Sequence, residues 1–272
     1  MIRCDCHVHS DISPDGKASM EEMCEAAIRR GLSEIVFTEH YECYYAGIRG
    51  RYFDREYLIR YFKRLEECRN RFEGRLMIHA GVELGQSHLD KAEAEMVRGF
   101  PFDLILGSVH KLGNVDLTWI CLTERNVRGI ADTYYRELER LSAEGTYDCI
   151  GHLDYMKKHC ARCGVHYEEE RYDSVIDRIL LNVIARGKGI EVNTACLGNV
   201  LEETMPDLPV LRRYRELGGK IVTVGSDAHI PERIGYGFEK AERRSERPDW
   251  NRVYVCRAVC DKDSQDKEDR ES

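Results

Sequence analysis

The sequence predicts an α/β fold in which parallel strands alternate with helices and close into a barrel. Strand-like apolar runs recur about seven times, and helical periodicity fills most of the intervals between them. A chain of 272 residues that is 42% hydrophobic can bury one large core, so we expect a single domain over 1–260. Closure into a barrel is the usual form of such a repeat at this length. An open, doubly wound sheet is the structural alternative.

The strands are expected at 2–6, 34–38, 76–83, 102–107, 147–150, 189–193 and 220–224. Ser19 and Glu22 form a capping box that predicts the start of a helix, and Gly31 marks its end. Apolar side chains at helical spacing predict two further helices, one across 130–141 and one across 175–183.

Two segments depart from the repeat. The segment 41–55 is a long aromatic and basic connection after the second strand, on the rim where loops supply substrate contacts. The segment 261–272 is almost entirely charged or polar and has no apolar period, so we expect a disordered tail.

Composition restricts the class of protein. A net charge of −8, without a basic stripe, argues against a nucleic-acid partner. The sequence shows neither a signal-peptide pattern nor an apolar run long enough to cross a bilayer, so we expect a cytoplasmic protein with no membrane partner. The composition gives no indication of oligomeric state.

The twelve cysteines are scattered, and many fall inside apolar patterns, which favours reduced, buried thiols over a disulfide framework. Cys4 and Cys6 alternate with His7 and His9 along the first strand. We therefore expect these two thiols to point away from the histidine face and toward the helices.

Residues able to bind metal ions gather where the predicted strands end. His7 and His9 are two residues apart, as are Asp227 and His229, so each pair lies on one face of the chain and can bind one ion. Further candidates follow other strands: His40, Glu83, His110 and His152, with Asp15 in the first loop. Ligands after six of seven strands favour a barrel with a polynuclear metal site over an open sheet, whose ligands would gather at one switch point.

The remaining histidines do not fit this pattern, and we expect structural roles for His79, His88, His159 and His166. Glu39 faces away from its neighbour His40, so we expect it to support the ligands and not to bind metal. For Glu83, a contact with the N-terminus of the following helix is the alternative.

Several motifs occur together in one order: His7-x-His9, Ser13-Pro-Asp15-Gly16, Thr38-Glu-His40, Gly81-Val-Glu83, Gly107-Ser-Val-His110, Gly151-His152-Leu-Asp154 and Ser226-Asp227-Ala-His229. In these motifs the chain resembles the polymerase and histidinol phosphatase family, and within it the monofunctional histidinol-phosphate phosphatases. The resemblance runs from the first strand to about Phe238. One departure is Glu39, where the family commonly has aspartate.

The resemblance implies a distorted (β/α)7 TIM-like barrel with three divalent metal ions at the C-terminal ends of the strands. It distributes the nine ligands as follows: one ion held by His7, His9, Glu83 and Asp227, a second by Glu83, His110 and His152, and a third by Asp15, His40 and His229. Imidazole and carboxylate ligands suit zinc, manganese and iron alike.

The resemblance also implies hydrolysis of L-histidinol phosphate in histidine biosynthesis. Phosphate monoesters need accelerations of up to about 10²¹, whereas one general acid or base contributes about 10²–10⁴, so metal ions are required. We expect a metal-activated water to attack phosphorus, with Glu83 as a shared ligand. Either Asp227 or His229 would then protonate the leaving alkoxide.

Two other functions stay open at this point. One is a phosphoesterase acting on another small monoester, such as a nucleotide or phosphotyrosine. The other is a non-catalytic metal-binding module, which missing ligands or fusion to a further domain would favour.

Substrate contacts are expected on the same rim. Basic residues near it are Arg49, Arg51, Lys111, Lys157, Lys158, Arg162 and Arg233, of which we expect two to contact phosphate, with Lys158, Arg233 and Arg162 as the first candidates. Related enzymes often have arginines where this chain has Lys157-Lys158 and 195–199, and this difference bears on the alcohol half of the substrate. Tyr44 and Tyr45, with Tyr41, Glu42 and Tyr52, are expected to bind the imidazole and amine.

Overall fold

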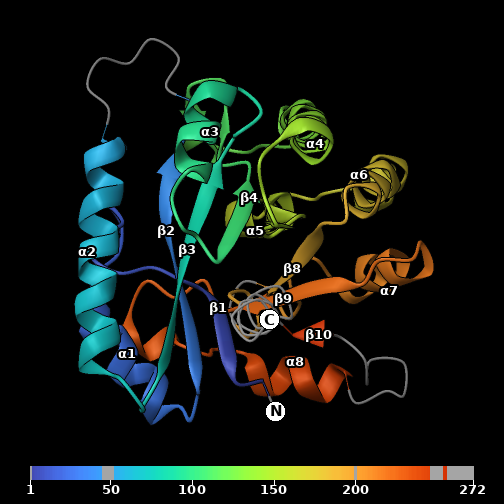
Figure 1. Ribbon diagram of the computed structural model, residues 1–272. Coiled ribbons are helices and arrows are strands. Elements are labelled where there is room, and N and C mark those ends of the chain that lie inside the picture. Colours follow the sequence, from blue (N-terminus) through green and yellow to red (C-terminus); the bar gives the residue numbers. More distant parts are fainter. Residues whose placement is uncertain (1, 45–51, 199–200, 246–253, 256–272) are drawn as a thin grey trace, which may run out of the picture.

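The computed structural model describes residues 2–44, 52–198, 201–245 and 254–255, in which seven parallel strands form a nearly closed barrel (Figure 1). The strands are β1 (Cys4–Val8), β2 (Glu34–Glu42), β3 (Met77–Gly85), β4 (Leu104–Ser108), β7 (Cys149–Ile150), β8 (Gly189–Asn193) and β9 (Ile221–Gly225). Each pairs with the next in chain order, and a two-residue strand, β10 (Tyr254–Val255), pairs with β9. All seven predicted strands are confirmed to within about two residues at most ends.

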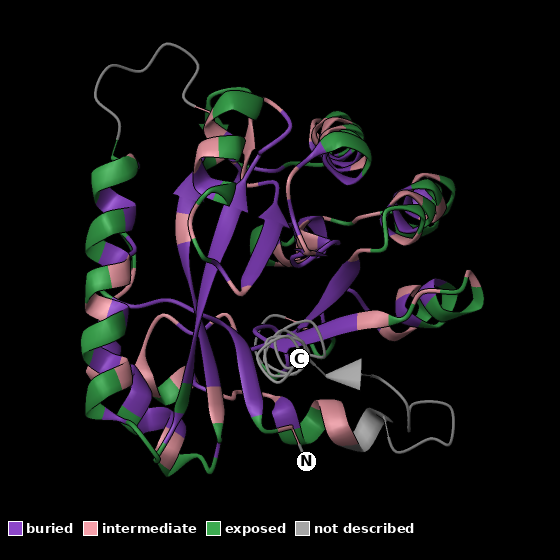
Figure 2. Cartoon of the chain, in the orientation of Figure 1, coloured by how far each residue is buried: buried purple, intermediate pink, exposed green. Residues whose placement is uncertain are grey.

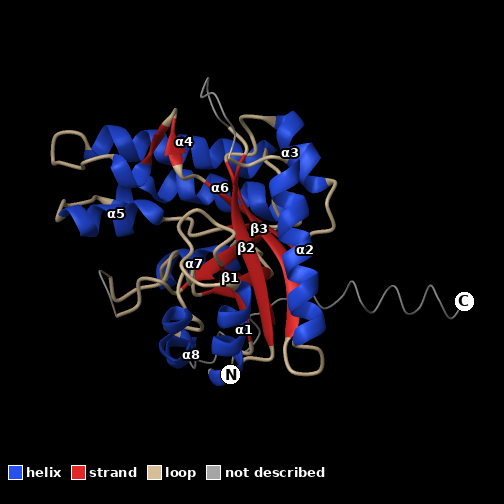
Figure 3. Cartoon of the chain, turned by 90° about the vertical axis from the view of Figure 1, so that its left-hand side faces the viewer, coloured by secondary structure: helices blue, strands red, loops and turns tan. Residues whose placement is uncertain are grey.

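Helices cover the outside of the strands, as Figures 1 and 3 show. They are α1 (Met20–Arg29), α2 (Arg55–Arg71), α3 (Lys91–Arg98), α4 (Val127–Glu144), α5 (Tyr155–Cys163), α6 (Asp173–Ala185), α7 (Leu208–Glu216) and α8 (Phe238–Ser245). Shorter elements are the hairpin β5 (Lys111–Leu112) and β6 (Val115–Asp116), and the 3₁₀ turns η1 (Leu117–Trp119), η2 (Glu169–Tyr172) and η3 (Pro231–Arg233).

The helices form where the local sequence predicts them. The capping box is confirmed: Ser19 accepts a hydrogen bond from the backbone of Glu22, whose side chain binds back to Ser19. The two apolar stripes lie on α4 and α6 and bury Tyr134, Leu138 and Ile179. Strands are buried almost throughout, whereas helices bury one face only (Figure 2).

The barrel closes where the beginning of the chain meets the end of β9. His9 N donates to Ala228 O at 2.9 Å, and Asp227 N donates to His7 O at 2.9 Å. Val8 and Ala228 form a parallel bridge. These bonds join the two edges that an open sheet would leave apart, so the barrel prediction is confirmed and the open-sheet alternative is wrong.

The prediction for Cys4 and Cys6 is wrong. Both thiols pack inside the barrel, with side chains that come from strands alone: Val36, Leu104, Leu106, Cys149 and Ile221. The pairing of β1 with β2 shifts register between Asp5 and Val8. A bulge of this kind breaks the alternation of faces, so Cys6 and His7 both point inward.

Among the described residues, every helix is too short or too polar to traverse a lipid bilayer. The predicted tail at 261–272 lies outside the described residues.

Asp5 holds the seam of the barrel. Its carboxylate accepts hydrogen bonds from Ser226 N (2.9 Å), Ser226 Oγ (2.6 Å) and Gly235 N (2.9 Å). The side chain is fully buried, and burial raises its pKa to about 6 against the lowering effect of these donors.

Asp5→Ala should leave these three buried donors without an acceptor and lower the free energy of unfolding by about 3 kcal/mol. For a chain of this size that corresponds to a fall of about 6–12 °C in Tm, measurable by thermal denaturation at fixed metal concentration. Asp177→Ala, which removes an ion pair with Arg213 on the outer surface, is the control and should change Tm little. Equal shifts in the two variants would contradict the role of Asp5.

Candidate metal centre

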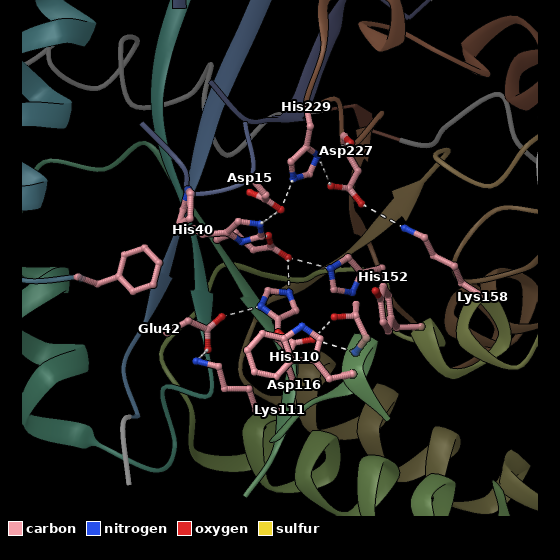
Figure 4. A pocket seen from close by; sticks show the side chains of 16 residues that line it. Asp15, His40, Glu42, His110, Lys111, Asp116, His152, Lys158, Asp227 and His229 are labelled. Atoms are coloured by element: carbon pink, nitrogen blue, oxygen red, sulfur yellow. Dashed lines mark hydrogen bonds and ion pairs between the residues drawn. The ribbon is translucent and has the colours of Figure 1, made fainter. Parts of the chain in front are cut away.

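The structure brings all nine predicted ligands together at the C-terminal ends of the strands (Figure 4). β1 and the residue after it supply His7 and His9, and the loop that follows supplies Asp15. The other ligands come from the ends of five further strands: His40, Glu83, His110, His152, Asp227 and His229. Parallel strands in a barrel place these ends on one rim, which is why positions so distant in sequence meet.

Glu83 lies at the centre of this cluster and is 1% exposed. Five imidazole nitrogens face its two carboxylate oxygens: those of His152 (2.7 Å), His40 (2.9 Å), His110 (2.9 Å), His7 (3.3 Å) and His9 (3.5 Å). Ser108 Oγ donates to the same carboxylate at 2.8 Å. One carboxylate therefore contacts imidazoles from four strands.

The atoms of His7, His9, Glu83 and Asp227 have the spacing of a metal site. Both histidine Nε2 atoms lie 3.6 Å from Asp227 Oδ1, and they are 3.0 Å from each other. Two ligands of one tetrahedral ion with bonds of about 2.0–2.1 Å are about 3.3 Å apart. These distances, together with those to Glu83, fit a single ion between the four side chains.

A second group surrounds Asp15, whose Oδ2 lies 3.1 Å from His229 Nε2 and 3.5 Å from His40 Nε2. Within the described residues, His229 Nε2 and His40 Nδ1 are buried without a hydrogen bond. Buried imidazole nitrogens that face carboxylate oxygens without hydrogen bonds are typical of ligand positions. The donor set therefore fits divalent metal ions.

Three sets of ligand atoms lie within 4.8 Å of one another: His7, His9 and Glu83; His40, Glu83 and His110; and His9, His40 and His229. The first belongs to one implied ligand set. The second contains Glu83 and His110 of one implied set, with His40 from another. The third contains His40 and His229 of one implied set, with His9 from another. The sites adjoin so closely that His9 and His40, whose rings stack at 4.2 Å, contact more than one group.

Carboxylates behind the imidazoles fix how they point. Glu191 Oε1 lies 2.6 Å from His7 Nδ1, and Glu42 Oε1 lies 2.7 Å from His110 Nδ1. With Nδ1–H donating to a carboxylate, Nε2 keeps its lone pair for a metal ion. Glu191 Oε2 also accepts from His152 N at 2.8 Å, so one residue positions two candidate ligands.

Glu39 has the supporting role that its position predicts. Its carboxylate accepts from Ser10 Oγ (2.5 Å) and Ser13 Oγ (2.5 Å), and from both backbone N–H groups. These bonds fix the turn between His9 and Asp15.

Sequence reasoning missed Glu191, which lies on the one strand without a predicted ligand. The signal was a glutamate inside the apolar run Gly-Ile-Glu-Val-Asn, where a buried charge needs a partner. The contact of Glu42 with His110 was also missed. The segment 41–55 was predicted to contact the substrate, whereas Glu42 is the last residue of β2 and orients a candidate ligand.

The charges of the cluster stabilise one another. Burial alone would raise the pKa of Glu83, but His110, His7 and His40 hold it well below the usual range. Burial likewise opposes ionisation of Asp227, yet His7, His9 and Lys158 hold its pKa well below normal. Both carboxylates are therefore ionised at neutral pH, as metal ligands must be.

Two candidate ligands adopt strained backbone conformations. Asp227 has φ +54° and His152 has φ +22°, a region that costs non-glycine residues of the order of 1–3 kcal/mol. Gly225 shows how closely the ligands pack, because a Cβ there would lie 2.3 Å from His7 Cβ and 2.5 Å from Glu191 Oε1. Strain and crowding at the rim favour a functional site over a packing role.

A cavity of about 460 Å³ opens above the cluster. Seven of the nine candidate ligands line it, whereas His7 and His9 are fully buried. Of the seven basic residues expected near the rim, Lys111 and Lys158 line the cavity, and Arg49 and Arg51 lie outside the described residues. Lys158 Nζ lies 3.9 Å from Asp227 Oδ2 and 5.2 Å from the centre of the Tyr155 ring.

Lys157, the neighbour of Lys158 on α5, turns away from the cavity. Its ammonium is buried between Asp207 (2.5 Å), Glu169 (2.8 Å) and Glu203 (3.2 Å). Lys157 therefore anchors α5 to the segments that precede α6 and α7.

The other predicted substrate contacts stay predictions. Arg162 is exposed and lies away from the cavity lining, and Arg233 donates to Ala195 O and stacks on the Tyr236 ring. Tyr44 is half-buried outside the cavity lining, and Tyr45 lies outside the described residues. The expectation for Tyr41 is wrong, because its side chain is fully buried and hydrogen-bonds to Glu93.

The structure leaves the four remaining histidines outside the cluster. His79 pairs with Glu34 at 2.9 Å, His88 pairs with Glu137 at 2.9 Å, and His159 Nε2 contacts Ile120 O at 2.8 Å. His166 is exposed.

The histidine-rich and carboxylate-rich centre on the barrel rim agrees with the family that the sequence matches. The chain belongs to the PHP domain family, which matches residues 5–195. The resemblance found in the motifs is thereby confirmed.

Similar proteins within this family share one name. A relative from Clostridium acetobutylicum, named "probable histidinol-phosphatase", is 30% identical over 89% of this chain and 92% of its own. The histidinol-phosphatase of Lactococcus lactis is 29% identical over 89% of both chains. A crystal structure of the L. lactis histidinol phosphate phosphatase, complexed with zinc, L-histidinol and phosphate, superposes with a TM-score of 0.75 at 25% identity, over 93% of this chain and 94% of that one.

Glu191→Gln should weaken divalent-metal binding about 10- to 100-fold, because a neutral amide orients His7 less strongly than a carboxylate. A chelator competition titration with zinc or manganese measures the effect. Glu34→Gln is the matched control, since it alters a carboxylate–imidazole pair at the opposite end of the strands. Equal weakening in both variants would show that Glu191 has no particular role in the site.

Proposed function

We propose that this protein is a metal-dependent phosphatase that hydrolyses L-histidinol phosphate to L-histidinol and phosphate, a step of histidine biosynthesis. The observation that carries the proposal is the cluster of nine histidine and carboxylate side chains around Glu83. The cluster lies on the rim of the barrel. The similar structure from L. lactis is complexed with zinc, L-histidinol and phosphate.

Three divalent ions, whether zinc, manganese or iron, would be held by the nine side chains. The tetrahedral spacing around His7 and His9 supports one of these positions, and the groups around Asp15 and around Glu83 with His110 support two more. When bound, such ions supply a hydroxide nucleophile at neutral pH and neutralise charge on the phosphoryl oxygens.

Lys158 is the best-placed residue for binding the phosphate. It lines the cavity and lies beside Asp227, and its pKa stays above the ordinary value because Asp227 and Tyr155 outweigh the effect of burial. The ammonium is therefore charged at neutral pH and is able to pair with a phosphoryl oxygen.

Of the two residues expected to protonate the leaving alkoxide, His229 is better suited. Asp227 is held in its ionised form, so it has no proton to give. His229 lines the cavity, and its Nδ1 lies 3.1 Å from Asp227 O, which can keep a ring N–H in place. A hydrogen-bond donor at this position can deliver a proton as the P–O bond breaks.

The proposed reaction is tested by phosphate release from histidinol phosphate and from a panel of sugar, nucleotide and amino-acid phosphates. We expect histidinol phosphate to have the highest kcat/KM, and His9→Ala and Glu83→Ala to lower turnover by several orders of magnitude. His79→Ala and His166→Ala should retain most of the activity when folded. Preference for another substrate, or equal losses in both pairs of variants, would contradict the proposal.

The metal content is a separate prediction. Protein purified without chelator should contain close to three divalent ions per chain by elemental analysis, because nine ligand side chains meet on the rim. A stoichiometry near zero after metal supplementation would show that the cluster is not a metal site.

A further inference from the structure

Asp116 differs from the other carboxylates that line the cavity. Glu83, Asp15, Asp227 and Glu42 each face an imidazole or an ammonium group. In the described part of the chain, Asp116 has no such partner within ion-pair distance. Its Oδ1 accepts only from Thr118 N (2.8 Å) and Thr118 Oγ1 (2.6 Å). Among the described residues, Asp116 is thus a cavity-lining carboxylate without an imidazole or ammonium group within 4.0 Å.

Trp119, which also lines the cavity, is 81% exposed. This is the highest exposure of any large apolar side chain among the described residues. Tryptophan is usually well buried, because its large ring gains free energy on leaving water. A bare indole face at the mouth of a polar cavity suits a ligand that covers it.

The turn that bears these two residues is anchored at both ends. The backbone of Asp116 pairs with that of Lys111 across the β5–β6 hairpin, while the Lys111 ammonium faces Glu42 at 3.2 Å, and Leu117 N donates to His110 O at 2.8 Å. At the other end, His159 Nε2 on α5 contacts Ile120 O at 2.8 Å. The backbone that carries the exposed indole is therefore fixed by hydrogen bonds at both ends. Less conformational entropy is lost when a ligand binds to a turn that is already ordered.

The placement of Asp116 ties it to the reacting end of the cavity. The hairpin begins directly after His110, and Leu117, the residue that follows Asp116, returns to donate its backbone N–H to His110 O at 2.8 Å. Lys158 and the metal ligands provide the positive surface that a phosphate needs. The cavity thus offers positive groups for an anion and, at Asp116, a carboxylate for a cation.

We propose that Asp116 and Trp119 form the subsite for the cationic organic half of the substrate. Asp116 pairs with a primary ammonium, and Trp119 covers the face of a flat ring next to it. The site thereby selects phosphate monoesters of amino alcohols. This inference rests on the proposed phosphatase activity, and it assigns the amine to Asp116 instead of the segment 41–55.

The test compares histidinol phosphate with its analogue that lacks the amine, 3-(imidazol-4-yl)propyl phosphate. Asp116→Asn keeps the oxygen that accepts from Thr118 but removes the charge. It should lower kcat/KM for histidinol phosphate by about tenfold or more, mainly through KM, and change the amine-free analogue less than about twofold. Asp132→Asn, at a 45% exposed side chain on the outer face of α4, is the control and should change neither substrate.

A second variant tests the ring. Trp119→Ala should lower kcat/KM for both imidazole substrates by a similar factor and leave glycerol phosphate unchanged, and Trp119→Phe should restore much of the loss. Equal losses on the substrates with and without the amine in Asp116→Asn, or no loss, would overturn the subsite. A parent enzyme that hydrolyses glycerol phosphate as well as histidinol phosphate would instead refute the proposed function, and the subsite with it.

Discussion

The burial of one carboxylate among five imidazoles is the constraint on which the rest of this structure depends. An isolated carboxylate would be too costly to bury in a barrel core, so Glu83 requires compensating partners on several sides, the imidazoles or the metal ions that they would hold. Those partners come from β1, β2, β4 and β7, and each must reach the same point. The register of the strands, the bulge in β1 and the positive φ at His152 all follow from bringing these rings to Glu83.

Much of the fold and of the site could be predicted from the sequence because both follow local patterns. The seven strands are short apolar runs, and the ligands stand directly after them, where parallel topology gathers them. Glu191 was missed because it lies inside a strand and not at its end, where the other ligands were sought, so only its charge within an apolar run marks it. The orientation of Cys4 and Cys6 failed for a different reason: a one-residue register shift depends on pairing with β2, which no local pattern reports.

The walls of the cavity come from parts of the fold with different degrees of regularity. The rim of the barrel places the metal ligands, and α5 places Lys158, since the ion pairs of Lys157 fix that helix on its other side. The β5–β6 hairpin and η1 are an insertion between β4 and α4 and have only two or three residues per element. Such short elements have no periodicity, which is why the contribution of Trp119 could not be foreseen.

The closure of the barrel joins the first residues of the chain to residues more than two hundred positions later. His7 and His9 bond to the backbone of Asp227 and Ala228, so the centre exists only after β9 has paired with its surroundings. A ribosome releases the chain with its N-terminus first, and the early histidines must wait for the late ones. A polypeptide terminated before β9 would lack Asp227 and His229, so the centre can be complete only in a chain synthesised past this strand.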